Sequence, residues 1–171
     1  MRKFILVFIL SLNLFGANEL KFKSLIGEFT QTITSQDQKI IYTGSLAIDS
    51  DFGAFWQYDT PMQKLIYFSN NQVIIIEPEL EQAIITNLKS SPDITKILKN
   101  AKKLSDDKFQ AVYEDVVYDI TTQNSLPKLI AYEDKLGNKA IIEFTQISKD
   151  KIISKEILTP QIPSNYDIIS N

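Results

Sequence analysis

The side chains that most often perform catalysis are scarce in this chain. Its 171 residues include no histidine and no cysteine, which excludes Ser-His-Asp and Cys-His catalysis and most zinc sites. Ser125 with Lys128, and Ser148 with Lys151, match the Ser-x-x-Lys spacing of some acyl-transferring enzymes. Neither pair is predicted to begin a helix, and no Lys-Thr-Gly follows. We therefore predict no nucleophilic catalysis.

Three alternating glutamates are the best candidates for acid–base chemistry. Glu77, Glu79 and Glu81 would line one face of an extended segment, where paired carboxylates can exchange protons. Pro78 interrupts that strand, however, and a charged turn of this kind is more often simply solvated. Residues 49–53 lack the spacing of a calcium-binding EF-hand loop, and the chain has no glycine-rich phosphate loop with its lysine. The sequence predicts a protein that is not an enzyme and needs no metal or cofactor.

Aromatic residues dominate one short stretch, residues 51–61. Phe52, Phe55, Trp56 and Tyr58 stand close together there, and Trp56 is the only tryptophan of the chain. On composition alone, such rings belong more often to a core than to the wall of a ligand pocket. Either interpretation needs an element that places several of the rings on one surface.

The elements around this stretch are predicted to be short strands. Segments rich in Ile, Val, Tyr, Phe and Thr alternate with turn-forming residues, which is typical of a meandering antiparallel sheet. The segments are QKIIYTGSLAID, FWQY, KLIYFS, QVIIIE, EQAIITNL, KFQAVYE, VVYDITT, KLIAYED, KAIIEFTQI and KEILT. Hairpin turns are expected at Asn70-Asn71 and Gly137-Asn138. Because several segments are apolar on both faces, the sheet must be covered on both faces or line a cavity on one.

A first helix is predicted near the start of the sheet. Phe22, Leu25, Ile26 and Phe29 have the i, i+3, i+4, i+7 spacing of an amphipathic helix. Gly27 would weaken that helix by about 1 kcal/mol, so the helix could end near it.

A second helix is predicted between the strands, in the stretch SSPDITKILKNAKKL. Ser91 can cap it, Pro92 suits its first turn, and Asp93 suits the positive end of the helix dipole. The apolar stripe of this helix consists of Ile94, Ile97, Leu98 and Ala101, extended by Leu104. Lysines occupy the other face, so the stripe should pack on the sheet.

The N-terminal stretch MRKFILVFILSLNLFGAN has the layout of a secretory signal peptide. Arg2 and Lys3 precede an apolar run, and the small residues Gly16 and Ala17 follow it. We predict a signal peptide over residues 1–17 and a single domain over residues 18–171, exported to the periplasm. An uncleaved anchor is the rival interpretation, although the run is short for a bilayer span. The net charge of -3 offers no electrostatic attraction to nucleic acids.

Four stretches together carry a resemblance to a known family. YTGSLAID is followed by Trp56 and Pro61, and SNNQVIIIEPELEQA contains a Pro-x-x-x-Gln segment at Pro78 and Gln82. LIAYEDKLGNKAIIEFTQI reads as a late hairpin, and ILTPQIPSNYDIIS as a proline-rich tail. In their order and spacing, and with the signal peptide, they resemble the LolA-like periplasmic carriers of outer-membrane lipoproteins. The resemblance runs through most of the chain after the signal.

The resemblance implies both a fold and a function. The fold would be mainly β, an open, half-closed antiparallel barrel of roughly eleven strands with helices covering its concave apolar side. The protein would be a monomeric periplasmic carrier that binds lipoprotein acyl chains in an apolar cavity and takes them from the inner to the outer membrane. Its partners would be lipoproteins, an ATP-driven transporter that releases them at the inner membrane, and an outer-membrane acceptor. A lipid-sensing regulatory protein of the same fold is the alternative.

The resemblance and strand alternation together imply which residues line the cavity. The residues expected on the strand side are Leu46, Ile48, Phe52, Trp56 and Tyr58, and those expected on the lid side are Phe22, Leu25, Phe29, Ile94, Ile97 and Leu98. A bulge at Gly53 could change which faces the later residues of the strand side occupy. The same side chains could also fill the space as ordinary core.

The chain departs from the family pattern just before the aromatic stretch. Members of the family usually carry Arg-Pro there, and the arginine closes the lid by donating hydrogen bonds to helix carbonyls. Ser50-Asp51 occupies this place, and neither side chain offers a comparable fork of donors. The lid is therefore expected to close differently or more weakly.

Overall fold

The computed structural model describes residues 20–36, 38–69, 72–87 and 93–170. The predicted signal peptide, the expected turn at Asn70-Asn71, and the expected helix-start residues Ser91 and Pro92 lie outside these ranges. Within them, no helix is both long and apolar enough to cross a membrane.

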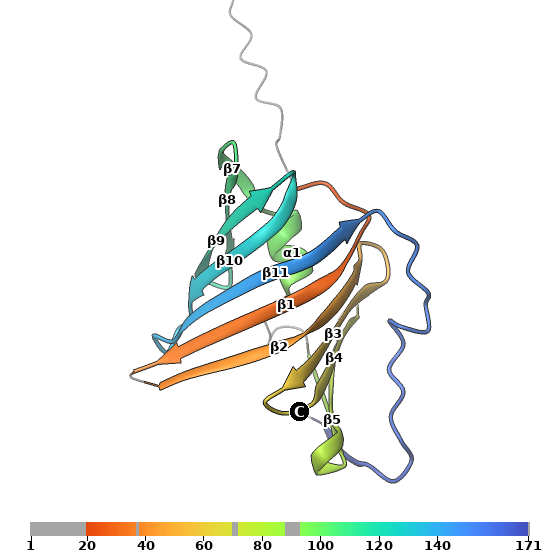
Figure 1. The fold of residues 1–171 in the computed structure, drawn as a ribbon. Coiled ribbons are helices and arrows are strands. Elements are labelled where there is room, and N and C mark those ends of the chain that lie inside the picture. Colours follow the sequence, from red (N-terminus) through yellow and green to blue (C-terminus); the bar gives the residue numbers. More distant parts are fainter. Residues whose placement is uncertain (1–19, 37, 70–71, 88–92, 171) are drawn as a thin grey trace, which may run out of the picture.

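The described residues form one sheet of twelve strands (Figure 1). Along the chain these are β1 (Ser24–Ser35), β2 (Gln38–Asp49), β3 (Gly53–Thr60), β4 (Lys64–Ser69), β5 (Gln72–Glu77), β6 (Gln82–Asn87), β7 (Lys102–Ser105), β8 (Lys108–Tyr113), β9 (Val116–Gln123), β10 (Leu126–Glu133), β11 (Lys139–Lys149) and β12 (Asp167–Ser170). Across the sheet the order is β12-β6-β5-β4-β3-β2-β1-β11-β10-β9-β8-β7. All neighbours are antiparallel except β12 and β6, which are parallel.

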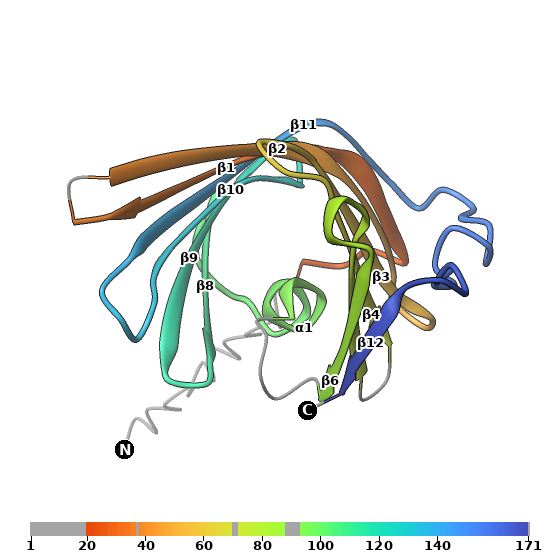
Figure 2. The ribbon, with the colours of Figure 1, turned by 90° about the horizontal axis from the view of Figure 1, so that it is seen from below.

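The sheet curves around a concave side without closing (Figure 2). β12 and β7 are its two edges and do not pair with each other. The predicted fold class, a mainly β half-closed barrel, is therefore confirmed. The sheet has twelve strands where the family resemblance implied roughly eleven, and β12, from the tail of the chain, pairs with β6 at one edge.

The N-terminal segment forms strand β1, so the helix predicted over residues 22–29 is wrong. In β1, Leu25, Gly27 and Phe29 are buried, while Ile26 and Glu28 are exposed, which is the two-residue period of a strand. Positions four apart share a face in a strand as well as in a helix, so Leu25 and Phe29 fit both patterns. The segment forms a strand because its backbone pairs with β2 on one side and with β11 on the other.

The described residues contain one α-helix, α1 (Ile94–Lys99). They also contain one short 3-10 helix, η1 (Pro78–Leu80). Asp93 caps α1, because its carboxylate accepts a hydrogen bond from the backbone of Lys96 at 3.2 Å. The predicted apolar stripe is buried at Ile94, Ile97, Leu98 and Ala101. Leu104 is not part of it: the chain has already entered β7, and Leu104 is 63% exposed.

Apolar clusters lie on both faces of the sheet, which is one of the two alternatives that its two-faced apolar strands left open. On the convex side, Ile162 and Tyr166 of the C-terminal segment pack against a cluster that includes Tyr67 and Ile76. On the concave side lies the main cluster, which includes α1. The expected strand KEILT is wrong, because residues 155–159 form turns within the C-terminal segment on the outside of the sheet.

The three glutamates considered for acid–base chemistry do not converge. Glu79 and Glu81 are exposed around η1, whereas Glu77 is buried at the end of β5. The Glu77 carboxylate accepts a hydrogen bond from Gln82 Nε2 at 2.5 Å and pairs with Lys64 Nζ at 2.9 Å. The hydrogen bond with Gln82 and the contact with Lys64 lower the pKa of Glu77. Glu77 therefore acts as a structural anion that ties β4, β5 and β6 together.

Replacing Glu77 is expected to weaken the fold at neutral pH. Because the folded pKa lies below its ordinary value, ionised Glu77 stabilises the protein above the unfolded-state pKa, and this is lost as pH falls through the folded pKa. Glu77→Gln should lower the free energy of unfolding by about 1 to 3 kcal/mol at pH 7. Urea unfolding at pH 7 and in acid should show the difference shrinking in acid. Exposed Glu79→Gln is the control, and equal effects of the two changes would contradict this role.

Candidate functional site

The concave face gathers almost all of the residues predicted to line a cavity. Those buried in its cluster are Leu25, Phe29, Leu46, Ile48, Trp56, Ile94, Ile97 and Leu98, and those packed against the cluster are Phe22 and Tyr58. Strand alternation accounts for the arrangement, because Leu46 pairs with Trp56 and Ile48 with Ala54 on the same face. The structure thus brings all but one of the predicted residues to one face, and their role in binding stays a prediction. The lid-side position predicted for Leu25 and Phe29 is wrong, because both lie on strand β1 of the sheet.

Phe52 is the exception, and its predicted position on the concave face is wrong. It lies in the turn between β2 and β3, is 52% exposed, and places its ring 4.5 Å from Lys155 Nζ. The Asp49 carboxylate accepts hydrogen bonds from the backbone of Asp51 (2.9 Å) and Phe52 (3.3 Å). These bonds bend the chain, as aspartate side chains commonly do in turns. Alternation therefore stops at Asp49 and resumes in β3.

Aromatic rings form the centre of the concave cluster. The Phe29 ring centroid lies 4.8 Å from that of Trp56 and 5.0 Å from that of Tyr58. Trp56 in turn lies 6.4 Å from Phe144 of β11. The aromatic stretch of β3 is therefore part of one apolar surface that continues across β2 and β1 to β11.

The sequence did not predict that a cluster of polar side chains would gather on the concave face. Its members, from β1, β2, β3, β9 and β10, are Gln31, Tyr42, Tyr58, Tyr118 and Tyr132, and we call them the tyrosine cluster. The Tyr58 hydroxyl donates to Gln31 Oε1 at 2.9 Å. Alternation within each strand could have placed each residue on the inner face, but only the pairing of β1 with β2 and β11 brings them together.

Burial shapes the electrostatics of the tyrosine cluster. It raises the pKa of Tyr118 to about 12, and it also raises the pKa of Tyr58 and Tyr132. A hydrogen bond with Gln31 opposes part of the rise at Tyr132. The hydroxyls of Tyr58, Tyr118 and Tyr132 are consequently neutral at physiological pH and can donate hydrogen bonds.

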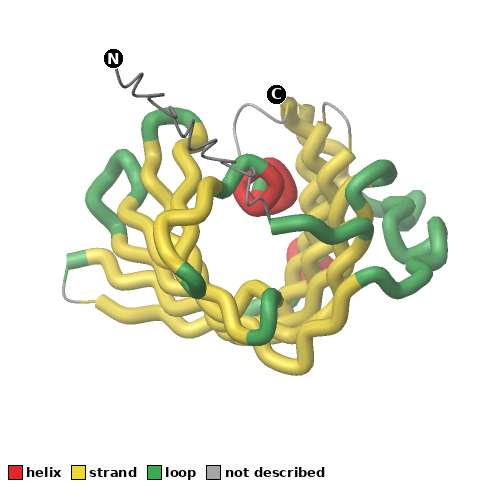
Figure 3. The backbone as a smooth tube through the Cα atoms, turned by 90° about the horizontal axis from the view of Figure 1, so that it is seen from above, coloured by secondary structure: helices red, strands yellow, loops and turns green. Residues whose placement is uncertain are grey.

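Helix α1 lies on the concave side, within the curve of the sheet (Figures 2 and 3). Ile97 and Leu98 are each 1% exposed and face the cluster. Because α1 has only six residues, its position depends on tertiary contacts rather than on helix propensity.

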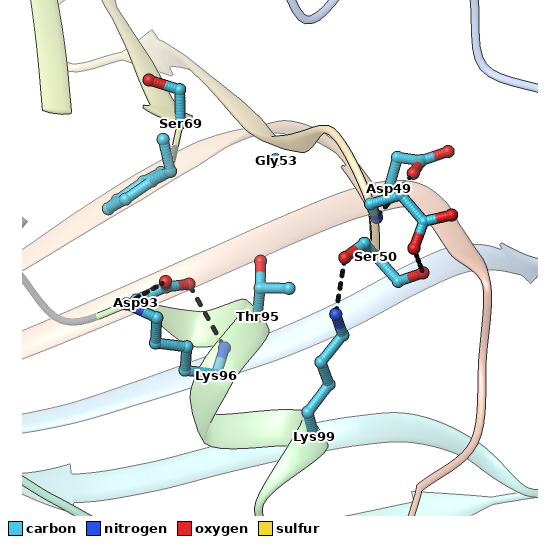
Figure 4. Close-up of a pocket in the computed structure, with 10 residues that line it drawn as sticks. Asp49, Ser50, Gly53, Ser69, Asp93, Thr95, Lys96 and Lys99 are labelled. Carbon is cyan, nitrogen blue, oxygen red and sulfur yellow. Dashed lines mark hydrogen bonds and ion pairs between the residues drawn. The ribbon is translucent and has the colours of Figure 1, made fainter. Parts of the chain in front are cut away.

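A lysine on α1 contacts the β2–β3 turn at the place where the family resemblance implies an arginine (Figure 4). Lys99 Nζ donates a hydrogen bond of 2.7 Å to the backbone carbonyl of Ser50. The donor is thus on the helix and the acceptor on the β2–β3 turn, the reverse of the arrangement that the family resemblance implies. A single exposed lysine contact contributes little stability, so α1 is held mainly by the buried side chains of Ile94, Ile97 and Leu98.

A polar pocket of about 130 Å³ separates the turn from the start of α1. Asp49, Ser50 and Gly53 line one side of it, and Thr95 and Lys96 line the other (Figure 4). Thr95 Oγ1 is buried and has no hydrogen-bond partner in the part of the chain that the structure describes. The helix and the turn are therefore not tightly packed at this point.

The fold and the concave surface define a class of protein: a half-barrel whose extended apolar concave face packs against a short helix. Within the described ranges, no group of three or more metal-ligating side chains occurs. The geometry suits binding of an apolar molecule by contact with the sheet.

Comparison with known proteins agrees with this class. The family described as outer membrane lipoprotein carrier protein LolA matches residues 20–125. The chain is 34% identical to an outer-membrane lipoprotein carrier protein of Campylobacter jejuni, over 99% of both chains. It is also 34% identical to the protein of that name from Wolinella succinogenes, over 91% of this chain and 94% of the other. The chain belongs to the LolA family.

Solved structures show the same fold at low sequence identity. A LolA superfamily protein from Nitrosomonas europaea matches with a TM-score of 0.50 and 9% identity, over 83% of this chain and 92% of the other. An uncharacterised conserved protein from Thermus thermophilus matches with a TM-score of 0.54 and 8% identity, over 89% and 93%. At these identities, the likeness concerns the fold alone.

Proposed function

We propose that this protein is a periplasmic carrier that binds lipoprotein acyl chains against its concave face and takes them to the outer membrane. The observation that carries the proposal is the continuous apolar surface around Phe29 and Trp56, against which, in the described residues, the short helix α1 and the segment before β1 pack. The names of its relatives support the same cargo. The acyl-chain site would consist of the concave cluster without Phe52.

The energetics of the cargo explain why a carrier of this shape is useful. Each buried CH₂ group of an acyl chain contributes about 0.8 kcal/mol, so a lipoprotein with several chains crosses water very unfavourably by itself. A carrier must offer comparable apolar contact and still release it. Strands can supply the permanent surface, while α1 moves aside when chains enter.

Export and partners complete the proposal. Residues 1–17 would act as the signal peptide of a single domain over residues 18–171. Since the chain has no phosphate-binding loop, the energy for loading would come from an ATP-driven transporter of the inner membrane. An acceptor at the outer membrane would receive the cargo.

Competition between ligands tests the carrier proposal. The purified protein should bind a fluorescent hydrophobic probe, and an acylated lipopeptide should displace it, whereas the same peptide without acyl chains should not. Trp56, the only tryptophan, lies in the concave cluster and gives a second signal. A protein that binds neither probe nor lipopeptide would contradict the proposal.

Depletion in cells separates a carrier from a lipid sensor of the same fold. Loss of a carrier should leave lipoproteins in the inner membrane, as fractionation would show. Correct lipoprotein localisation together with an altered stress response would instead support the sensor.

A further inference from the structure

The tyrosine cluster is a polar interruption in an otherwise apolar surface. Gln31 is a buried residue, and its strand neighbours on the concave face are the apolar Phe29 and Ile33. The hydrocarbon part of an acyl chain contains no hydrogen-bond acceptor, so the presence of donors on this face needs another explanation. One is that they satisfy each other and stabilise the fold; another is that they bind a polar part of the cargo.

The hydrogen bonds of the cluster leave donors free. Tyr58 donates to Gln31 Oε1, and the Gln31 amide nitrogen donates one of its two hydrogens to Tyr132, so it retains one hydrogen for another partner. In the described residues, Tyr42 and Tyr118 make no side-chain hydrogen bond, yet their hydroxyls are not among the buried polar atoms without partners. Tyr42 is half-buried, whereas Tyr118 is 2% exposed and lies in the concave cluster, so donation by Tyr118 requires the cluster to open for the cargo.

The distance between the tyrosine cluster and the β2–β3 turn, which α1 contacts, is long enough to hold an acyl chain. Tyr42 of the cluster pairs with Gln31. From Tyr42, strand β2 runs seven positions further to Asp49, which precedes the turn that Lys99 contacts. At about 3.3 Å per residue, this is roughly 23 Å. An acyl chain in one leaflet of a bilayer spans roughly 15 Å, half of the hydrocarbon thickness. The apolar stretch between cluster and turn is long enough for a chain.

Building on the proposed carrier function, we propose that the tyrosine cluster binds the ester and amide carbonyls that attach the acyl chains to the lipoprotein. Carbonyl oxygens accept hydrogen bonds, and the neutral hydroxyls and the Gln31 amide donate them. The chains then extend along Phe29, Trp56 and Leu46 toward α1. The peptide part of the cargo leaves the protein beside the β1–β2 hairpin, where Ile40 is exposed.

Removing hydroxyls while keeping the rings tests the inference. The triple variant Tyr42→Phe, Tyr118→Phe and Tyr132→Phe retains the aromatic surface and loses three donors. Two ligands are compared, a diacylated lipopeptide and a fluorescent hydrocarbon probe without carbonyl groups. The variant should bind the lipopeptide about 10-fold or more weakly, since each net hydrogen bond changes affinity several-fold. Its affinity for the hydrocarbon probe should remain within about 2-fold of the wild type.

Tyr67→Phe is the matched control, because Tyr67 is a buried tyrosine of the convex cluster. It should leave the affinities for both ligands unchanged. If the triple variant binds lipopeptide as tightly as the wild type, or loses both ligands equally, the inference is overturned and the cluster is structural. If the wild type binds neither ligand, the carrier proposal itself fails. Thermal unfolding of each variant shows whether it is folded during the measurement.

Discussion

Crosslinking α1 to the β2–β3 turn is expected to abolish acyl-chain binding. Ile97 and Leu98 occupy the concave face in this structure, so chains can reach Phe29 and Trp56 only if α1 moves. Lys99 Nζ lies 2.7 Å from the Ser50 carbonyl, which brings these two positions within reach of a short thiol-reactive crosslinker. Since the chain has no cysteine, Ser50→Cys with Lys99→Cys provides the only reactive pair.

The measurement uses a crosslinker that contains a reducible bond. Binding of the hydrophobic probe should fall by about 10-fold or more after crosslinking, because the open population is removed. Reduction of the linker should restore it. The control pair is Thr43→Cys with Thr60→Cys, on neighbouring strands whose side-chain oxygens are 2.8 Å apart. Full binding by the crosslinked Ser50–Lys99 pair would show that chains bind elsewhere.

Phe29→Ala is expected to be among the most destabilising single substitutions. Phe29 is 2% exposed and contacts the rings of Trp56 and Tyr58. Gly44 on β2 leaves room for its ring, since a Cβ at that position would lie 3.0 Å from Phe29 Cε1. Loss of the ring should cost about 3 to 5 kcal/mol through lost burial and the cavity left behind. For a chain of this size that lowers Tm by roughly 6 to 20 °C.

Phe52→Ala removes the same atoms from the outside of the sheet. The Phe52 ring is half-exposed and contacts Lys155, so its loss should cost less than about 1 kcal/mol. Calorimetric unfolding of both variants measures the contrast. Similar Tm values for the two variants would contradict the placement of Phe29 inside and Phe52 outside.

The helix predicted at the N-terminus shows where sequence patterns are ambiguous. Leu25 and Phe29, four residues apart, share a face in both a helix and a strand. Gly27 already argued against a helix interior, and the threonines that follow in β1 favour strands. The pairing of β1 with β11 joins residues more than a hundred positions apart. No local window contains that information.

The error at Phe52 has a related cause. Alternation predicted the inward position of Trp56 and Tyr58 correctly, because both lie within the regular part of β3. Phe52 has no strand partner, and its direction depends on the hydrogen bonds that Asp49 accepts in the turn. Strand periodicity carries no information where the backbone leaves the strand.

Residue types and their spacing were enough to predict the mainly β class, the apolar stripe of α1, the two-faced strands and the family resemblance. These depend on residue types at short spacing, which local backbone preferences and the pattern of burial dictate. Tertiary structure alone decided the position of β1, the contact of Lys99 with Ser50, and the tyrosine cluster. These bring together side chains from distant strands, and only long-range pairing and curvature of the sheet set their distances.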